Sequence, residues 1–142
     1  MEVSENCIET VYRAIKRSCP PNYVIFDAEG KTEISPALFK DENGVSVSKQ
    51  MRRTKEEVIL HLQEKLINKN GQTRLKGAVT LSEKDILDAK AILVSRETSA
   101  DKYHAEIHKN HDEKLLSNLQ MLQLADSCKL CHWDDSVENT YS

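Results

Sequence analysis

A helix with a well-marked beginning and end constrains this 142-residue chain more than any other feature. Thr54-Lys55-Glu56-Glu57 forms a capping box, in which the threonine hydroxyl accepts from an early helix amide and Glu57 reaches back. The apolar residues that follow recur at helical spacing: Val58, Ile59, Leu62 and Leu66. Asn70-Gly71 provides a stop signal. We therefore predict a helix that buries one face.

The fifty residues before this helix are divided into short segments by turn signals. Cys19-Pro20-Pro21 ends the first segment, because two prolines remove two amide donors. Asp27-Ala28-Glu29-Gly30 and Asp41-Glu42-Asn43-Gly44 predict turns, the second more strongly because Asn-Gly tolerates positive φ. Strands are expected in the intervals between and after these turns: 23–26, 32–34 and 45–48.

The first segment, Cys7 to Ser18, fits both a helix and a strand, and we interpret it as a helix. Its Arg13 and Tyr12 suit a phosphate or a carboxylate, but we read them as a surface arginine and a core tyrosine. The basic stretch Lys49 to Arg53 is interpreted in the same way, as a solvated face.

The second half of the chain predicts a strand, a short helix and a strand in close succession: 74–81, 82–90 and 91–94. Such an order favours one sheet with a helix on its face. A last helix is expected at 114–125, with Asn110 and Glu113 as its cap and a leucine stripe: Leu115, Leu116, Leu119 and Leu122. The fold class predicted is α+β, with a small antiparallel or mixed sheet and two to four helices.

Length and composition favour a single compact domain over residues 1–131, followed by a polar tail at 132–142. The net charge of -3 is mixed along the chain, so nucleic acid is neither required nor excluded as a partner. No stretch approaches the roughly 20 apolar residues that span a bilayer, and the acidic start, Met1 to Asn6, is unlike a secretory signal. We expect a cytoplasmic protein without membrane contact.

Histidines gather in the segment Tyr103-His104-Ala105-Glu106-Ile107-His108. A strand would turn Ala105 and Ile107 to the core and place His104, Glu106 and His108 together on the other face. A helix would stack His104 above His108. Both interpretations cluster imidazoles, whose pKa of about 6.5 suits metal binding, proton transfer or a response to pH.

Four cysteines in a chain of this length do not indicate a disulfide scaffold, so free thiols or a metal site are expected. Cys128-Lys129-Leu130-Cys131 has the spacing at which a tight turn presents two thiolates to one Zn²⁺. His104, alone or with His108, would complete three or four zinc ligands. The other interpretation is a pair of ordinary thiols near Trp133.

The pair His104-Ala105-Glu106 and Cys128-x-x-Cys131 resembles the zinc-dependent deaminases of nucleosides and nucleobases, whose pattern is His-x-Glu followed by Pro-Cys-x-x-Cys. The resemblance implies His104, Cys128 and Cys131 as zinc ligands and Glu106 as the catalytic proton shuttle. It covers less than a third of the chain, and Ser127 stands where the family has proline.

Two classes of function follow from these patterns. We expect a small non-catalytic binding or accessory module that acts through a protein partner or self-association and carries no cofactor. The alternatives are a zinc-dependent hydrolase resembling the deaminases, with Glu106 as its catalytic residue, and a structural zinc site alone. Whether the chain is an enzyme depends on whether His104 meets the two cysteines.

Overall fold

The computed structural model describes residues 9–141, and within that range the chain forms two antiparallel sheets and three α-helices. The strands are β1 (Thr10–Lys16), β2 (Val24–Phe26), β3 (Thr32–Ile34), β4 (Val45–Lys49), β5 (Leu75–Ser82), β6 (Ile92–Ser95), β7 (His104–His108) and β8 (Lys129–Trp133). The helices are α1 (Lys55–Lys65), α2 (Glu83–Asp88) and α3 (Asn118–Ser127), with 3₁₀ turns η2 (Pro21–Tyr23) and η3 (Pro36–Phe39).

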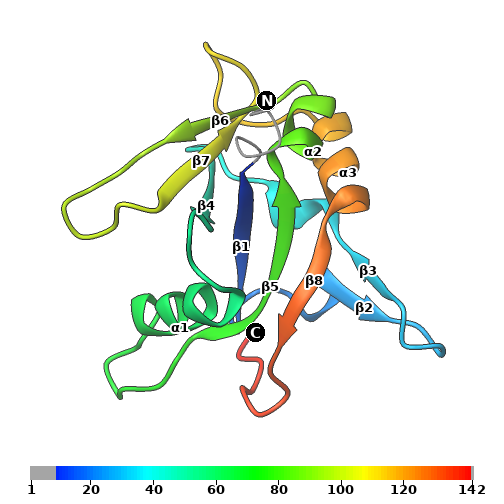
Figure 1. Ribbon diagram of the computed structural model, residues 1–142. Coiled ribbons are helices and arrows are strands. Elements are labelled where there is room, and N and C mark those ends of the chain that lie inside the picture. Colours follow the sequence, from blue (N-terminus) through cyan, green and yellow to red (C-terminus); the bar gives the residue numbers. More distant parts are fainter. Residues whose placement is uncertain (1–8, 142) are drawn as a thin grey trace.

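The main sheet has six strands in the order β6-β7-β4-β1-β5-β8, and every neighbouring pair is antiparallel. The β2–β3 hairpin forms a separate two-stranded sheet. Figure 1 shows β1 and β5 at the centre, with the β6–β7 pair on one side and β8 on the other. The chain is a single small domain that combines a mostly antiparallel sheet with helices, as the sequence predicts.

The first segment is a strand, so the prediction of a helix there was wrong. Val11 and Ile15 face one side of β1 and Tyr12 the other, and all three are buried. A strand in the middle of a sheet that is covered on both faces buries its odd-numbered and its even-numbered residues alike. Its apolar residues therefore lose the strict alternation that distinguishes a strand from a helix.

Two apolar clusters cover opposite faces of the main sheet. The larger cluster contains Val11, Val47 and Ile107 with residues of η3, α2 and α3. The smaller cluster joins Tyr12 and Ala78 to the buried face of α1. Because neighbouring residues of a strand point to opposite faces, Val11 and Tyr12 place α1 on one face and α3 on the other.

The capping box at Thr54 is confirmed. Its hydroxyl accepts from the Glu57 amide at 3.1 Å, and the Glu57 carboxylate accepts from the Thr54 amide at 2.8 Å. The last helix, in contrast, begins four residues later than predicted. Ser117 and Gln120 form its capping box, while Asn110 and Glu113 hold a turn before it.

This later start changes which leucines of the predicted stripe are buried. Leu116 is 2% exposed, but Leu115, Leu119 and Leu122 are 40%, 62% and 48% exposed. The buried face of α3 is instead formed by other residues: Gln120, Met121, Leu124 and Ala125. Leu119 and Leu122, three residues apart on α3, and Leu115 in the loop before it are the exposed leucines of this segment, and we call these three residues the leucine strip.

A polar tail was expected at 132–142, and the described part of it, residues 132–141, makes several contacts with the fold. Trp133 ends β8 opposite Gly77, and an added Cβ at Gly77 would lie 2.7 Å from the His132 carbonyl oxygen. Val137 is 9% exposed, and the Thr140 amide donates to the Arg17 carbonyl at 2.8 Å. The acidic segment Met1 to Asn6 lies outside the described residues. Across 9–141, no helix has both the length and the apolar character needed to cross a bilayer.

Candidate functional site

The main sheet opens between β1 and β4. Among residues 9–141, these strands are paired at Val11 with Lys49 and Tyr12 with Ser48, next to a Gln50 amide that donates to the Thr10 carbonyl at 2.8 Å, whereas β1 stays paired with β5 along its whole length. Beyond Tyr12 the two strands separate, and the Arg13 side chain lies in the opening. Its Nη1 donates to the Ser46 carbonyl of β4 at 3.0 Å, and its Nε donates to the Leu38 carbonyl of η3 at 3.2 Å.

Arg13 keeps hydrogen-bonding capacity after these two bonds. A guanidinium has five N–H donors, so two donated bonds leave three N–H groups without a protein acceptor among residues 9–141. Burial lowers the pKa of Arg13, while the nearby Asp41 carboxylate raises it. The Arg13 pKa still lies far above neutrality for an arginine, so the side chain is a partly buried cation.

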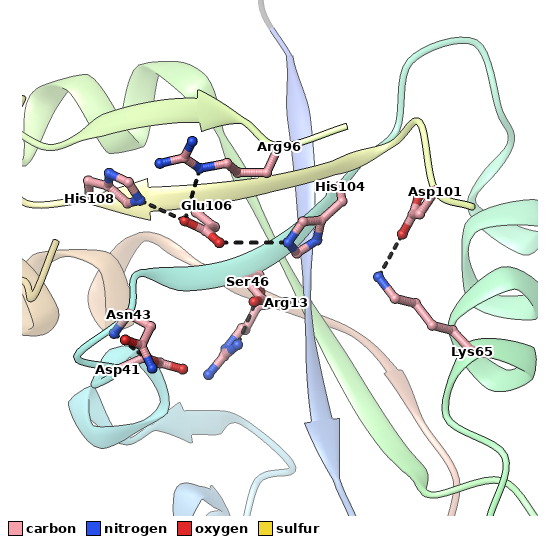
Figure 2. A network of polar contacts seen from close by, with 10 residues as sticks. All are labelled: Arg13, Asp41, Asn43, Ser46, Lys65, Arg96, Asp101, His104, Glu106 and His108. Carbon is pink, nitrogen blue, oxygen red and sulfur yellow. Dashed lines mark hydrogen bonds and ion pairs between the residues drawn. The ribbon is translucent and has the colours of Figure 1, made fainter. Parts of the chain in front are cut away.

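A cleft of about 710 Å³ lies at this opening, and we call it the Arg13 pocket. Its walls come from β1, β4, η3, α1 and the segment before β7, and they include Tyr12, Arg13, Leu38, Ser46, Lys65 and His104. Figure 2 shows Arg13 and Ser46 at the centre, with Asp41 on one side and the Lys65–Asp101 pair on the other. The volume falls in the range of about 300 to 1,000 Å³ that is typical of small-molecule sites.

Positive charge exceeds negative charge around the pocket. Its lining contains the cations Arg13, Lys16, Lys40 and Lys65 and two carboxylates, Asp41 and Asp101. Lys65 and Asp101 neutralise each other at 2.6 Å. In the described part of the chain, no carboxylate is within ion-pair distance of Arg13, Lys16 or Lys40. After the Lys65–Asp101 pair is excluded, the described lining thus has three cations and one carboxylate, Asp41.

The Lys65–Asp101 pair connects α1 to the segment before β7 and closes one side of the pocket. Asp101 is 8% exposed and accepts from Lys65 Nζ and from the Tyr103 amide, the latter at 2.9 Å. Burial alone would raise the pKa of Asp101, but these two hydrogen bonds outweigh it and lower the pKa. The carboxylate is therefore ionised and fixed, which gives this wall a defined shape.

The strand interpretation of the histidine segment is confirmed. Ala105 and Ile107 are fully buried in the larger cluster, and the other three side chains meet on the opposite face (Figure 2). Glu106 Oε1 lies 2.8 Å from His108 Nε2 and 3.4 Å from Arg96 Nε, and Glu106 Oε2 lies 3.8 Å from His104 Nε2.

The contacts of Glu106 fix its charge state. Burial would raise the pKa of Glu106, but the hydrogen bonds from His108 and Arg96 lower it overall. His104 is the member of this group that lines the Arg13 pocket. Glu106 is thus an ionised anchor for its neighbours, and His104 brings the group to the pocket edge.

The structure does not bring the two cysteines to these histidines. Cys128 ends α3 within the larger cluster, and its Sγ donates to the Ala125 carbonyl at 3.3 Å. Cys131 lies on β8 against the smaller cluster, on the other face, and donates to the Ala78 carbonyl at 3.3 Å. Three strands separate β8 from β7, a path of roughly 19 Å along the sheet at about 4.8 Å per strand.

The residues proposed as zinc ligands do not fit a zinc site in this arrangement. Zinc binds thiolate sulfur and imidazole nitrogen at about 2.0 to 2.3 Å, which requires His104, Cys128 and Cys131 to converge on one point. Burial raises the pKa of Cys128 to about 12 and that of Cys131 to about 11, which favours neutral thiols. Within residues 9–141, no three His, Cys, Asp or Glu side chains are grouped as metal ligands.

The basic stretch at Lys49 to Arg53 is used inside the fold and not as an open phosphate site. Arg53 packs 3.5 Å from the centroid of the Tyr103 ring, donates to Ser48 Oγ at 3.0 Å, and lies 2.9 Å from His61 Nδ1. Lys49 donates to Ser95 Oγ at 2.9 Å. These contacts tie the end of β4 and the turn after it to α1, β6 and the segment before β7.

From the sequence, Arg13 was interpreted as a surface arginine and not as a ligand-binding residue. Lys16, Lys40 and Asp101 were not predicted as site residues. One signal was present for Arg13. Once the first segment is read as a strand, Arg13 falls on the same face as Val11 and Ile15, so a charge stands among core residues. Buried charges need a structural or functional partner. If the segment is read as a helix, Arg13 can lie on the exposed face, so the charge among core residues is not apparent.

Comparisons of this chain with protein-family models, with curated proteins and with solved structures give no match. The function must therefore be argued from the geometry of the Arg13 pocket itself.

Proposed function

We propose that this protein is a non-catalytic binding module whose ligand presents an anionic group to Arg13 in the Arg13 pocket. The observation that supports this most directly is the partly buried guanidinium, which has three N–H groups available at the wall of a cleft of about 710 Å³. Charge-assisted hydrogen bonds from arginine are among the stronger polar contacts in proteins. A fixed cation in a preformed cleft is therefore suited to hold an anion.

Binding is favoured over catalysis by the hydrogen bonds of the pocket hydroxyls and thiol. Nucleophilic catalysis needs a hydroxyl or thiol within reach of a base. In residues 9–141, no hydrogen bond joins Ser18, Ser46 or Cys19 of the pocket to a histidine or a carboxylate, and the Ser48 hydroxyl is held by Arg53. Glu106, the catalytic residue that the deaminase resemblance implies, is occupied by His108 and Arg96.

Thermal unfolding in the presence of simple anions tests this function. Acetate, citrate and phosphate are compared with sodium chloride at equal ionic strength, because a ligand that binds only the folded state raises the unfolding temperature. We expect at least one of these anions to raise it in the wild type and none in Arg13→Gln. Arg52→Gln, at an exposed arginine outside the pocket, should behave as the wild type. Equal stabilisation of Arg13→Gln, or no stabilisation of the wild type, would contradict the proposal.

A second candidate function is the protein-partner role, which the leucine strip supports. Leu115, Leu119 and Leu122 place apolar surface on the outer side of α3, and Leu87 of the neighbouring α2 is also 56% exposed. Apolar patches of this kind are common at protein contacts. Sedimentation velocity of the wild type and of Leu119→Lys with Leu122→Lys tests self-association. A concentration-dependent dimer that the double variant loses supports this role, and an identical monomer in both argues against self-association.

A further inference from the structure

We propose that the group held by Arg13 is the phosphate of a small phosphomonoester, with the organic part of that molecule lying along the apolar wall of the Arg13 pocket. This inference rests on the proposed function and names its ligand class. Three observations carry it: the charge left unbalanced in the pocket, the orientation of the Arg13 guanidinium, and the size and composition of the cleft.

The unbalanced charge matches a dianion. After the Lys65–Asp101 pair is set aside, the charged residues among 9–141 that line the pocket are Arg13, Lys16 and Lys40 with one carboxylate, Asp41, which leaves two positive charges. A phosphomonoester carries about -1.5 to -2 near neutral pH. A carboxylate or a phosphodiester carries -1 and would leave one cation without a counter-charge.

The Arg13 guanidinium is turned so that its outer end is available. Its Nε is used by the Leu38 carbonyl and one Nη1 hydrogen by the Ser46 carbonyl, so an anion has to bind at the outer end of the guanidinium. The remaining hydrogens are on Nη1 and Nη2, which can reach two oxygens of one tetrahedral group. The Leu38 and Ser46 carbonyls thus fix the guanidinium at the pocket wall and leave its other N–H groups as donors for a ligand.

The lysines supply a second and a third contact from separate elements. Lys16 ends β1 and Lys40 follows η3, and both are exposed at the pocket. Long flexible lysines that line the same cleft as a fixed arginine can close on a phosphate as point charges. The hydroxyls of Ser18, Ser46 and Tyr23 also line the cleft and can donate to phosphate oxygens.

The cleft is larger than a phosphate needs. Water takes about 30 Å³ in the liquid, so a phosphate of five heavy atoms fills only a small part of about 710 Å³. The rest of the lining includes Tyr12, Leu38, Leu62 and Leu66. Such a wall suits an apolar or flat organic group, as small-molecule sites generally do. The ligand is therefore a phosphorylated small molecule and not the inorganic ion alone.

The test is an NMR titration of ¹⁵N-labelled full-length protein with three probes: methyl phosphate, dimethyl phosphate and acetate. At about pH 7.5 the monoester is largely a dianion, because its second pKa is about 6, whereas the diester and acetate are monoanions. Low ionic strength keeps screening small. We expect methyl phosphate to give saturable shifts at Arg13, Ser46 and His104 with a dissociation constant on the order of 1 mM, and the two monoanions to bind about tenfold more weakly.

Arg13→Gln should also weaken methyl phosphate binding, but it removes two hydrogen bonds of the fold. Two further variants test the phosphate site without touching Arg13. Lys16→Gln combined with Lys40→Gln changes only exposed side chains and should weaken methyl phosphate binding about tenfold but acetate binding only about threefold, because the coulombic attraction scales with the charge of the anion. Arg52→Gln serves as the matched control and should bind as the wild type. Equal affinity for all three probes at the pocket would overturn the phosphomonoester inference and leave the proposed function standing. Absence of pocket shifts with every probe would overturn both.

Discussion

The Arg13 guanidinium donates to the Ser46 carbonyl across the gap between β1 and β4, at 3.0 Å. A side chain thus supplies a donor to β4 where the backbone pairing of the two strands has ended. The same guanidinium also donates to the Leu38 carbonyl of η3, so it joins two strands and a 3₁₀ turn. Arg13 therefore both holds the opening of the sheet in shape and presents a cation to the pocket there.

Replacement of Arg13 by leucine is expected to destabilise the fold by about 1 to 2 kcal/mol, because the Leu38 carbonyl, in a part-buried hydrogen bond, and the Ser46 carbonyl, in an exposed one, both lose a donor. Arg13→Lys should recover less than half of this loss, since an ammonium cannot span both carbonyls in the arginine geometry. Urea unfolding measures both variants. Arg52→Leu should change stability by less than about 0.5 kcal/mol, and an equally large effect there would argue against a specific role for Arg13.

Gly44 is expected to be sensitive to a single methyl group. It has φ of +94°, and an added Cβ would lie 2.7 Å from His108 Cδ2 and 3.1 Å from Glu106 Oε1. Gly44→Ala should therefore cost about 2 to 3 kcal/mol, from backbone strain together with displacement of His108 from Glu106.

Gly71 provides the matched control for Gly44. It also has positive φ, +78°, but an added Cβ there would lie more than 4 Å from every described atom outside the glycine and its two chain neighbours. Gly71→Ala should cost only the backbone strain, about 1 kcal/mol. Equal losses of stability in the two variants, measured by denaturant unfolding, would show that the contact with His108 contributes nothing.

The Glu106 carboxylate is expected to make the free energy of unfolding depend on pH in the acid range. Its pKa is lowered in the folded state from the ordinary value of 4.5, so the unfolded chain binds the proton more tightly. The contribution of Glu106 is therefore fully present above about pH 4.5 and is lost as the pH falls through the lower folded pKa. Glu106→Gln should cost about 1 to 2 kcal/mol at neutral pH, and the difference from the wild type should shrink below pH 4.5.

Glu113→Gln is the control for this acid dependence, because the Glu113 side chain is 59% exposed and pairs with Lys109 on the surface. Its stability should follow the wild type at every pH. If Glu106→Gln showed a constant deficit from neutral pH down to about pH 3, the lowered pKa of Glu106 would not be the source of the effect.

Cys128 and Cys131 are expected to resist alkylation in the folded protein. Their raised pKa values, about 12 and about 11 against an ordinary 9.0, lower the thiolate fraction at neutral pH by roughly a hundredfold or more. Iodoacetamide labelling followed by peptide mass spectrometry should give far slower modification of both residues in the folded than in the urea-unfolded chain. Rapid labelling of both that zinc blocks would instead support the metal site.

Several elements could be predicted from the sequence because local interactions determine them. The α1 helix follows from a capping box and an apolar face that lie within a few residues of each other, and the turn at Gly44 follows from the positive φ that Asn-Gly accepts. The strand β7 was one of two alternatives, and its pairing with β4 and β6 decided between them. The start of α3 could not be predicted, because Asn110 and Ser117 both offer caps, and the helix that begins after Ser117 buries Gln120, Met121, Leu124 and Ala125 against the rest of the fold.

By itself, the sequence determined the capped helix α1, the turns between the short strands, and the clustering of the imidazoles of His104 and His108, which both interpretations of that segment predict, since these depend on neighbours along the chain. Only the tertiary structure decided that β1 is a central strand, that Cys128 and Cys131 lie on opposite faces of the sheet, and that Arg13 meets Ser46 and Leu38 at a pocket that Lys16 and Lys40 also line. The physical reason is that strand order and sheet curvature place residues far apart in the chain side by side, and no local pattern records that order.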